Sequence, residues 1–216
     1  MKLYTSFGPN PRAARMVVAE KSLDVETVEV DLMGMENRQS AYLQKNPGGQ
    51  LPALELDDGL VIAETMAIFE YLEERHPQPA LIGSTPEERA ETRMWQRRVE
   101  LKITEHLYNG FRFGEGIELF KPRIRVLPEA ADGLKATARD GLVWMNELLD
   151  GKQTIVGDRF TVADVILYCA LDFGRGVGQP FDTSLGNLSG WFKRVARRPS
   201  ASGSLHPQHE AVGMAG

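Results

Sequence analysis

The sequence predicts a mixed fold, in which an α/β domain of the order β-α-β-α-β-β-α is followed by an all-helical bundle domain. Up to about residue 80, segments that alternate like strands take turns with segments whose apolar residues recur every three or four positions, as on helices. Beyond that point, four helical patterns follow one another without a convincing strand. A helix between two strands indicates a parallel crossover, and the last two strands of the first domain form an antiparallel hairpin.

The first strand, helix and second strand follow from short local signals. Residues 2–5 form a short strand, and Phe7-Gly8-Pro9 is a turn. Asn10 is the expected N-cap of the first helix, with Pro11 at the first helical position, where a missing N–H costs nothing. Tyr4 lies inside the strand and is expected to pack in the core. The second strand alternates apolar with polar residues at Val28, Val30 and Leu32.

A short irregular helix over 36–44 and a loop over 46–49 lead to the most informative segment, Gln50-Leu51-Pro52-Ala53-Leu54. Proline is tolerated at the first residue of a strand but not in its middle, so Pro52 opens a strand. A cis Leu51–Pro52 bond would turn the backbone N–H and C=O of Leu51 outward, where they can pair with another peptide backbone. The turn over 57–59 then predicts a hairpin with residues 60–63.

Glu64 and Thr65 begin the last helix of this domain, whose apolar face has helical spacing. A helix N-terminus is electropositive and has unpaired N–H groups. A hydroxyl and a carboxylate at that end can together hold the α-carboxylate and the α-ammonium of an amino acid. The segment 50–65 therefore predicts a peptide-backbone clamp beside a zwitterion clamp.

The predicted domain boundaries are 1–80 for the α/β domain, 81–86 for a linker, 87–205 for the helical domain and 206–216 for a tail. Helices are expected from residue 86 to about 108, over 129–149, from 161, and from about 188 to 198. Thr161 and Asp164 have the spacing of a capping box, which indicates a folding role and no catalytic one. The residues after Ser200 are rich in Gly, Ser and Ala, and we expect them to be poorly packed.

Composition excludes several classes of protein. The chain has 216 residues and a net charge of −5, so electrostatic attraction to nucleic acid or to an anionic membrane is disfavoured. No apolar run of about 18 residues exists, and the N-terminus lacks a signal pattern. The single cysteine, Cys169, fits a reducing compartment, so we expect a cytoplasmic protein. The four histidines have no metal-ligand spacing, and no metal site is predicted.

Taken in this order and spacing, Gln50-Leu51-Pro52, Glu64-Thr65 and Phe160-Thr161-Val162-Ala163-Asp164 resemble the cytosolic glutathione transferase family. The similarity covers about residues 1 to 200. It is nearest to an atypical bacterial and yeast subgroup that lacks the usual catalytic Tyr, Ser or Cys of the first domain. The resemblance implies a thioredoxin-like first domain that binds glutathione, a homodimer, and an active site between the two domains.

The resemblance also implies roles for individual residues. Leu51, next to Pro52, would bind the cysteinyl backbone of glutathione, and Gln50 would line the tripeptide. Glu64 would meet the γ-glutamyl ammonium, and Thr65 the neighbouring carboxylate. Asn37 and Arg38 stand where relatives often place a His or Lys for the glycyl carboxylate. Arg38 is the stronger candidate because a charge-assisted hydrogen bond is about twice as strong as a neutral one.

A transferase must present glutathione as its thiolate, and a donor aimed at sulfur lowers the thiol pKa. In this family the donor lies just after the first strand. Asn10 and Ser6 are the two candidates here; their other interpretations are an N-cap and a turn hydrogen bond. Backbone N–H groups or an ordered water are alternatives, and Arg112, where relatives often carry His, would add positive charge unless it forms a surface ion pair.

Tyr108, Phe111 and Phe113 cluster near the end of the first long helix and predict an apolar pocket for a hydrophobic substrate, or else part of the core. The predicted function is conjugation of glutathione to a small hydrophobic electrophile, in the manner of a detoxification enzyme with glutathione as co-substrate. Glutathione-dependent peroxide reduction or ether cleavage needs the same thiolate and remains an alternative. A third hypothesis is an interaction protein that kept the fold and lost catalysis.

Overall fold

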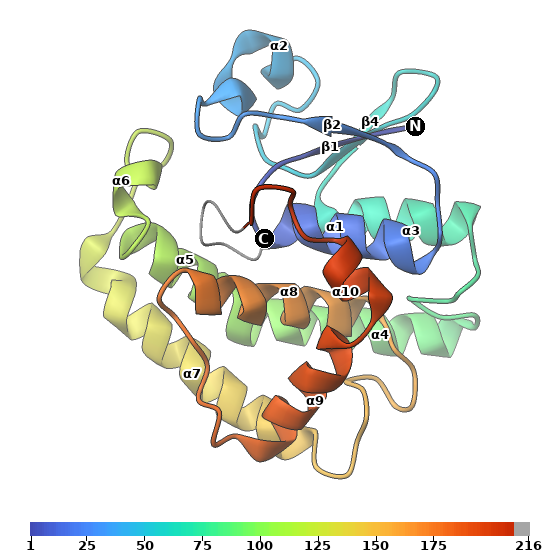
Figure 1. Cartoon of the computed structure of the whole chain (residues 1–216), viewed down its shortest axis with the longest axis vertical. Coiled ribbons are helices and arrows are strands. Elements are labelled where there is room, and N and C mark those ends of the chain that lie inside the picture. Colours follow the sequence, from blue (N-terminus) through green and yellow to red (C-terminus); the bar gives the residue numbers. More distant parts are fainter. Residues whose placement is uncertain (210–216) are drawn as a thin grey trace. The chain divides into compact units, whose positions relative to one another are not determined.

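The computed structural model describes residues 1–209, which pack as two units (Figure 1). The first unit contains Met1–Leu81 together with residues 199–209, and the second contains Ile82–Arg198. This division differs from the predicted boundaries, because residues 199–209 pack on the first unit. Of the predicted tail, residues 210–216 lie outside the described residues.

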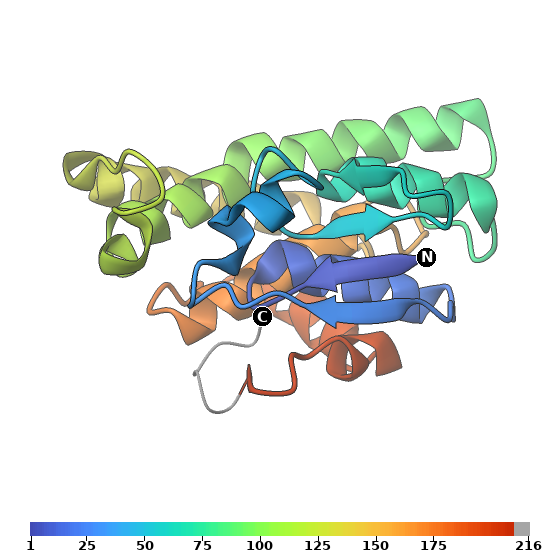
Figure 2. The ribbon, with the colours of Figure 1, turned by 90° about the horizontal axis from the view of Figure 1, so that it is seen from above.

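The first unit is built on a four-stranded mixed sheet of order β2-β1-β3-β4 (Figure 2). Its strands are β1 (Lys2–Thr5), β2 (Glu26–Glu29), β3 (Ala53–Glu55) and β4 (Val61–Ala63). β1 runs parallel to β2 and antiparallel to β3, with Leu3 opposite Leu54, and β3 pairs with β4 as a hairpin. The predicted parallel crossover and hairpin are confirmed. The second strand is displaced from its predicted centre, and Val30 follows it with an N–H bond to the Thr5 carbonyl of 2.9 Å.

Helices α1 (Pro9–Glu20) and α3 (Thr65–Arg75) supply the apolar side chains that face this sheet. Met16, Val17, Ile68, Phe69 and Leu72 are all fully buried with Leu3 and Leu54. Between β2 and β3 lie a 3₁₀ turn, η1 (Glu36–Arg38), and the short helix α2 (Ser40–Leu43), as the irregular pattern predicted. A short α10 (Pro199–Gly203) packs on α1 (Figure 1).

Three expectations for this unit are wrong. Gly8, not Asn10, caps α1, so that Pro9 is the first helical residue and Asn10 the second. Tyr4 is only half-buried, because its hydroxyl reaches the rim of the sheet and donates to Glu55 at 2.6 Å. The segment after Ser200 is not poorly packed: Ser200, Ala201, Ser204 and His206 are all buried.

Within the residues that the structure describes, the regular elements of the second unit are helices, with one isolated β-bridge between Val156 and Arg159. Its elements are α4 (Pro86–Val99), the π-helical turn η2 (Glu100–Thr104), α5 (Glu105–Phe113), α6 (Ile117–Phe120), η3 (Pro128–Ala130), α7 (Ala131–Leu148), α8 (Val162–Gly176) and α9 (Gly186–Ala196). The long helix predicted from residue 86 is α4, η2 and α5 in series. At Gly141 of α7, an added Cβ would lie 2.3 Å from the Lys102 carbonyl, so only glycine allows α7 to approach η2 this closely.

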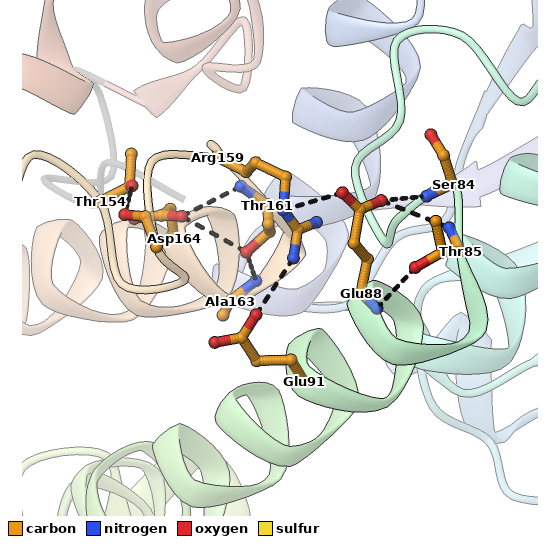
Figure 3. A network of polar contacts seen from close by, with 10 residues as sticks. Ser84, Thr85, Glu88, Glu91, Thr154, Arg159, Thr161, Ala163 and Asp164 are labelled. Carbon is orange, nitrogen blue, oxygen red and sulfur yellow. Dashed lines mark hydrogen bonds and ion pairs between the residues drawn. The ribbon is translucent and has the colours of Figure 1, made fainter.

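The second unit has two capping boxes, and Arg159, two residues before one of them, pairs with the glutamate of the other (Figure 3). Thr161 and Asp164 begin the almost wholly buried α8, which confirms the predicted box, and Thr85 and Glu88 begin α4 in the same way. Arg159 pairs with Glu88 at 3.8 Å and with Glu91 at 3.5 Å, and so ties the start of α4 to the turn before α8. Among residues 1–209, no helix is both long and apolar enough to cross a membrane.

Candidate active site

The loop before β3 is held in shape by side chains of its own unit. The Tyr42 hydroxyl and the Asn46 amide both donate to the Gln50 carbonyl at 2.8 Å. Burial raises the pKa of Tyr42 to about 12, so this hydroxyl remains a donor at physiological pH. The Leu51–Pro52 bond is cis, and within residues 1–209 the Leu51 N–H and C=O have no backbone partner. The structure thus leaves one peptide donor and one acceptor available for an extended ligand.

At the start of α3, Glu64 has φ +69°, a left-handed conformation that is costly for a residue with a side chain. Its carboxylate is exposed, and its carbonyl accepts the first helical bond, from Ile68 N–H at 3.1 Å. The N–H groups of the three residues before Ile68 have no partner inside the helix. Thr65, half-buried, places its hydroxyl at this electropositive end. Backbone strain of this kind is typical of ligand sites.

Asn37 and Arg38 have different surroundings although they are adjacent. Asn37 is 2% exposed, and its amide donates to the Gly49 carbonyl at 2.7 Å, so its donor is already used by the loop. Arg38 is half-buried and, within residues 1–209, donates only a long bond, of 3.4 Å, to the Gly48 carbonyl. Arg38 is therefore the residue of this pair with charge to offer a ligand.

The N-terminus of α1 has very few hydrogen-bond donors. Pro9 and Pro11 have no N–H, and the Arg12 N–H is bonded to the Gly8 carbonyl at 3.1 Å. Asn10 therefore carries the only free N–H of the helix's first turn, together with a half-buried side-chain amide. The Ser6 hydroxyl is fully buried and has no hydrogen-bond partner among the described residues. Of the two thiol-site candidates, Asn10 is the one that a ligand can reach.

The aromatic residues predicted as a substrate pocket belong to the second unit, around α5 and α8. Tyr108 and Phe111 both meet Phe173 edge to face, at 6.2 and 5.2 Å between ring centroids. Tyr108 is buried as part of the core, and burial raises the pKa of its hydroxyl. Phe111 and Phe113 are half-buried, so they keep apolar surface for a ligand.

Arg112 lies on the same helix as these aromatic residues. It donates to the Asn109 amide oxygen at 3.0 Å, and its guanidinium carbon lies 5.8 Å from the ring centroid of Phe120. Burial lowers the pKa of Arg112 below its ordinary value. The structure gives it no carboxylate partner among residues 1–209, and so the surface ion pair considered above is not formed there.

Sequence reasoning missed three residues that shape the site: Tyr42 and Asn46, which fix the loop, and Arg15, which donates to the Ser6 carbonyl at 3.0 Å. The only available signal was the loop-forming Asn46-Pro47-Gly48-Gly49. Within the described residues there is also no group of three or more His, Cys, Asp or Glu side chains that could hold a metal ion.

Comparison with known proteins identifies the family. Residues 1–74 match the glutathione S-transferase N-terminal domain, and residues 127–199 match the C-terminal domain. The chain is 31% identical to glutathione S-transferase 2 of Saccharomyces cerevisiae, over 91% of this chain and 85% of that protein. It is 35% identical to maleylacetoacetate isomerase of Pseudomonas aeruginosa, over 98% of this chain and 96% of that protein.

A solved structure agrees with these relatives. A glutathione S-transferase domain-containing protein from Marinobacter aquaeolei superposes with a TM-score of 0.86 at 37% identity, covering 93% of this chain and 99% of that one. The fold, the order of the two domains and these relatives agree: the chain belongs to the glutathione transferase family, and it is a transferase.

Proposed function

We propose that this transferase activates the thiol of glutathione for attack on a small hydrophobic electrophile, and that Asn10 is the donor to the thiolate. The observation that carries the proposal is the scarcity of donors at α1. Two prolines and one internal hydrogen bond leave Asn10 with the first turn's free N–H, and its side-chain amide is a second donor.

The tripeptide would be held by contacts within the first unit alone. Leu51 would pair with the cysteinyl backbone, and Gln50 would line the tripeptide. Glu64 and Thr65 would take the γ-glutamyl ammonium and carboxylate, and Arg38 the glycyl carboxylate. The free backbone groups of Leu51 and the strained helix start at Glu64 support these roles. Asn37 keeps a supporting role, because its amide holds Gly49.

The expected decrease in the pKa of the glutathione thiol follows from the donors at the start of α1. A neutral hydrogen bond contributes about 0.5–1.5 kcal/mol and a helix N-terminus about 0.3–1 kcal/mol. Together these lower a thiol pKa by about one unit, or nearly two at most, from its free value of about 8.5. Arg112, if it approaches the sulfur, would add to this shift. Phe111 and Phe113 would supply apolar contact for the electrophile, and we place the enzyme in the cytoplasm as a homodimer.

The first test separates binding from activation. We expect Thr65→Val, which removes a hydroxyl at nearly constant volume, to weaken glutathione binding about tenfold in a calorimetric titration. We expect Asn10→Ala to leave the affinity for S-methylglutathione unchanged. In the same variant, the pH at which kcat/KM for an aryl halide reaches half its plateau should rise by about one unit. Ser6→Ala, in the same strand-to-helix segment, is the control for a local packing change. An unchanged pH profile in Asn10→Ala would contradict the assignment.

A second function is favoured by one comparison, the long match to a relative called maleylacetoacetate isomerase. A thiolate that adds reversibly to an activated double bond allows rotation about that bond and then leaves, so glutathione is regenerated. Conjugation consumes glutathione, whereas isomerisation does not. Mass spectrometry of the products from an activated cis-alkene therefore distinguishes the two reactions.

A further inference from the structure

The chain's last described segment, Pro199–His209, lies on the first unit and is named here the C-terminal strap (Figures 1 and 2). Its α10 packs on α1, and the Ser200 hydroxyl donates to the Glu20 carboxylate there. Ser204 is fully buried and His206 is 4% exposed. Small and polar residues thus form a buried interface.

Two arginines of α1 make most of the polar contacts to the strap. Arg12, which is 1% exposed, donates to the Ala201 carbonyl at 3.1 Å and to the Ser204 hydroxyl at 3.4 Å. Arg15 donates to the Ser204 carbonyl at 2.9 Å and, through its Nη1, to the Thr5 hydroxyl at 2.6 Å and the Ser6 carbonyl at 3.0 Å. The Arg15 guanidinium therefore joins the strap to the end of β1, just before the thiol loop.

His206 makes the second contact to that loop. Its ring lies 3.9 Å from the ring of Phe7, centroid to centroid, at an interplanar angle of 42°. Its Nδ1 accepts the Gln208 N–H at 3.1 Å, so the proton of the neutral ring belongs on Nε2. Nε2 in turn lies 3.1 Å from the Glu29 carboxylate at the edge of β2. The ring thus lies between Gln208 and Glu29 with Phe7 packed against it, although the Nε2–Glu29 contact lacks hydrogen-bond geometry.

We propose that His206 is a positioning residue for the thiol site: by holding Phe7, the strap sets the place of the Asn10 donors. This inference rests on the proposed function. Phe7 is followed by Gly8, the N-cap of α1, whose carbonyl accepts the Arg12 N–H at 3.1 Å, and then by Pro9 and Asn10 of the helix itself. A displacement of Phe7 is therefore passed to the start of α1. The first turn has no second residue with a free N–H to replace Asn10.

The test uses the full chain with His206→Ala, with His209→Ala as the matched control. His209 belongs to the same strap, but its ring contacts only the His206 carbonyl among the described contacts, and not Phe7. His206→Phe keeps an aromatic ring against Phe7 while it removes the Glu29 contact. Two quantities are measured: the affinity for S-methylglutathione, and the pKa of the bound glutathione thiol from its ultraviolet thiolate absorbance.

We expect His206→Ala to raise the pKa of the bound glutathione thiol by about one unit. At a pH below that pKa, the thiolate fraction then falls about tenfold. The affinity for S-methylglutathione should stay within twofold of the parent protein's. His206→Phe should restore most of the shift, and His209→Ala should show none. An unchanged thiol pKa in His206→Ala overturns the proposal. A loss of S-methylglutathione affinity as large as the loss of thiolate also overturns it, because that result indicates a merely structural role.

A measurement without ligand keeps this inference separate from the proposed function. In amide NMR spectra of the free protein, His206→Ala should move the signals of Gly8, Asn10 and Arg12, while those of the first turn of α3 stay in place. If the parent protein binds no glutathione, the proposed function fails, yet these shifts still test the positioning. Unmoved signals at Gly8 and Asn10 refute it in either case.

Discussion

Replacement of Asp164 offers the sharpest test of what holds the helical unit together. Asp164 is fully buried, and its carboxylate accepts the N–H groups of Thr161 and Ile155, each at 3.0 Å, and the indole N–H of Trp191 at 2.8 Å. One side chain therefore satisfies three buried N–H donors, from the start of α8, the turn before it and α9. Its burial raises the pKa of the Asp164 carboxyl above its usual range.

The expected cost follows from that count of donors. Asp164→Ala leaves all three without a partner, at about 1–3 kcal/mol each, and entry of water and relaxation recover part of the loss. We expect the free energy of unfolding to fall by about 3–5 kcal/mol. Asp164→Asn keeps one oxygen acceptor but turns an amide towards a donor, so it should cost about half as much. Trp191→Phe removes a donor and leaves none orphaned, and should cost about 1–2 kcal/mol.

Urea denaturation followed by far-ultraviolet circular dichroism measures these differences, and it avoids fluorescence, which Trp191 itself would perturb. The essential result is that the loss in free energy of unfolding decreases from Asp164→Ala to Asp164→Asn to Trp191→Phe. If Asp164→Ala and Asp164→Asn agree within about 0.5 kcal/mol, or if Asp164→Ala costs less than about 1 kcal/mol, orphaned donors are not what governs this site.

Two further changes test other parts of the chain. Gly49→Ala forces a Cβ to 2.8 Å from the Arg38 guanidinium at a φ of +60°, so we expect several-fold weaker glutathione binding by calorimetry. Gly59→Ala is the control: it has the same backbone strain of a positive φ, +88°, but no atom within 4 Å, and it should bind glutathione normally. The pKa of Glu88 is lowered because the Ser84 N–H donates to its carboxylate. A depressed pKa contributes stability above the unfolded value of about 4.3 that is lost as pH falls through the folded value. The gap in denaturation midpoint between the parent and Glu88→Gln should therefore close in acid, and a gap that persists there contradicts this account.

Much of the fold was predictable because its signals are local. The capping box of Thr161 and Asp164 spans four residues, and the proline at the start of β3 and the helix start at Thr65 are each recognisable from a few neighbours. Physical constraints of this kind act within a turn or a strand end. All the residues that set such a constraint are close together in the sequence, so the constraint can be recognised there.

The strap was not predictable for the opposite reason. Apart from His206, its buried residues are small, and hydrogen bonds to Arg12 and Arg15, nearly the whole chain away, hold them. Apolar periodicity, which identifies buried helices, is absent from such a segment. The same limit hid the role of Tyr42, whose hydroxyl donates from α2 to the Gln50 carbonyl in the loop. A Gly- and Ser-rich composition indicates flexibility only when no distant donor is available to order it.

The arrangement of donors in the first unit separates two tasks that a transferase must perform. Affinity for the tripeptide would come from Leu51, Thr65 and Arg38, which lie on three different segments, so the loss of one leaves the others in place. Within the first unit, activation would depend on Asn10, because Pro9 and Pro11 remove the neighbouring donors. A mutation that moves α1 by a fraction of an ångström should therefore affect the thiolate and spare binding. The strap contacts this sensitive end of the unit directly at Phe7 and, through Arg15, at Ser6. In this arrangement a buried histidine far along the chain can affect reactivity more than affinity.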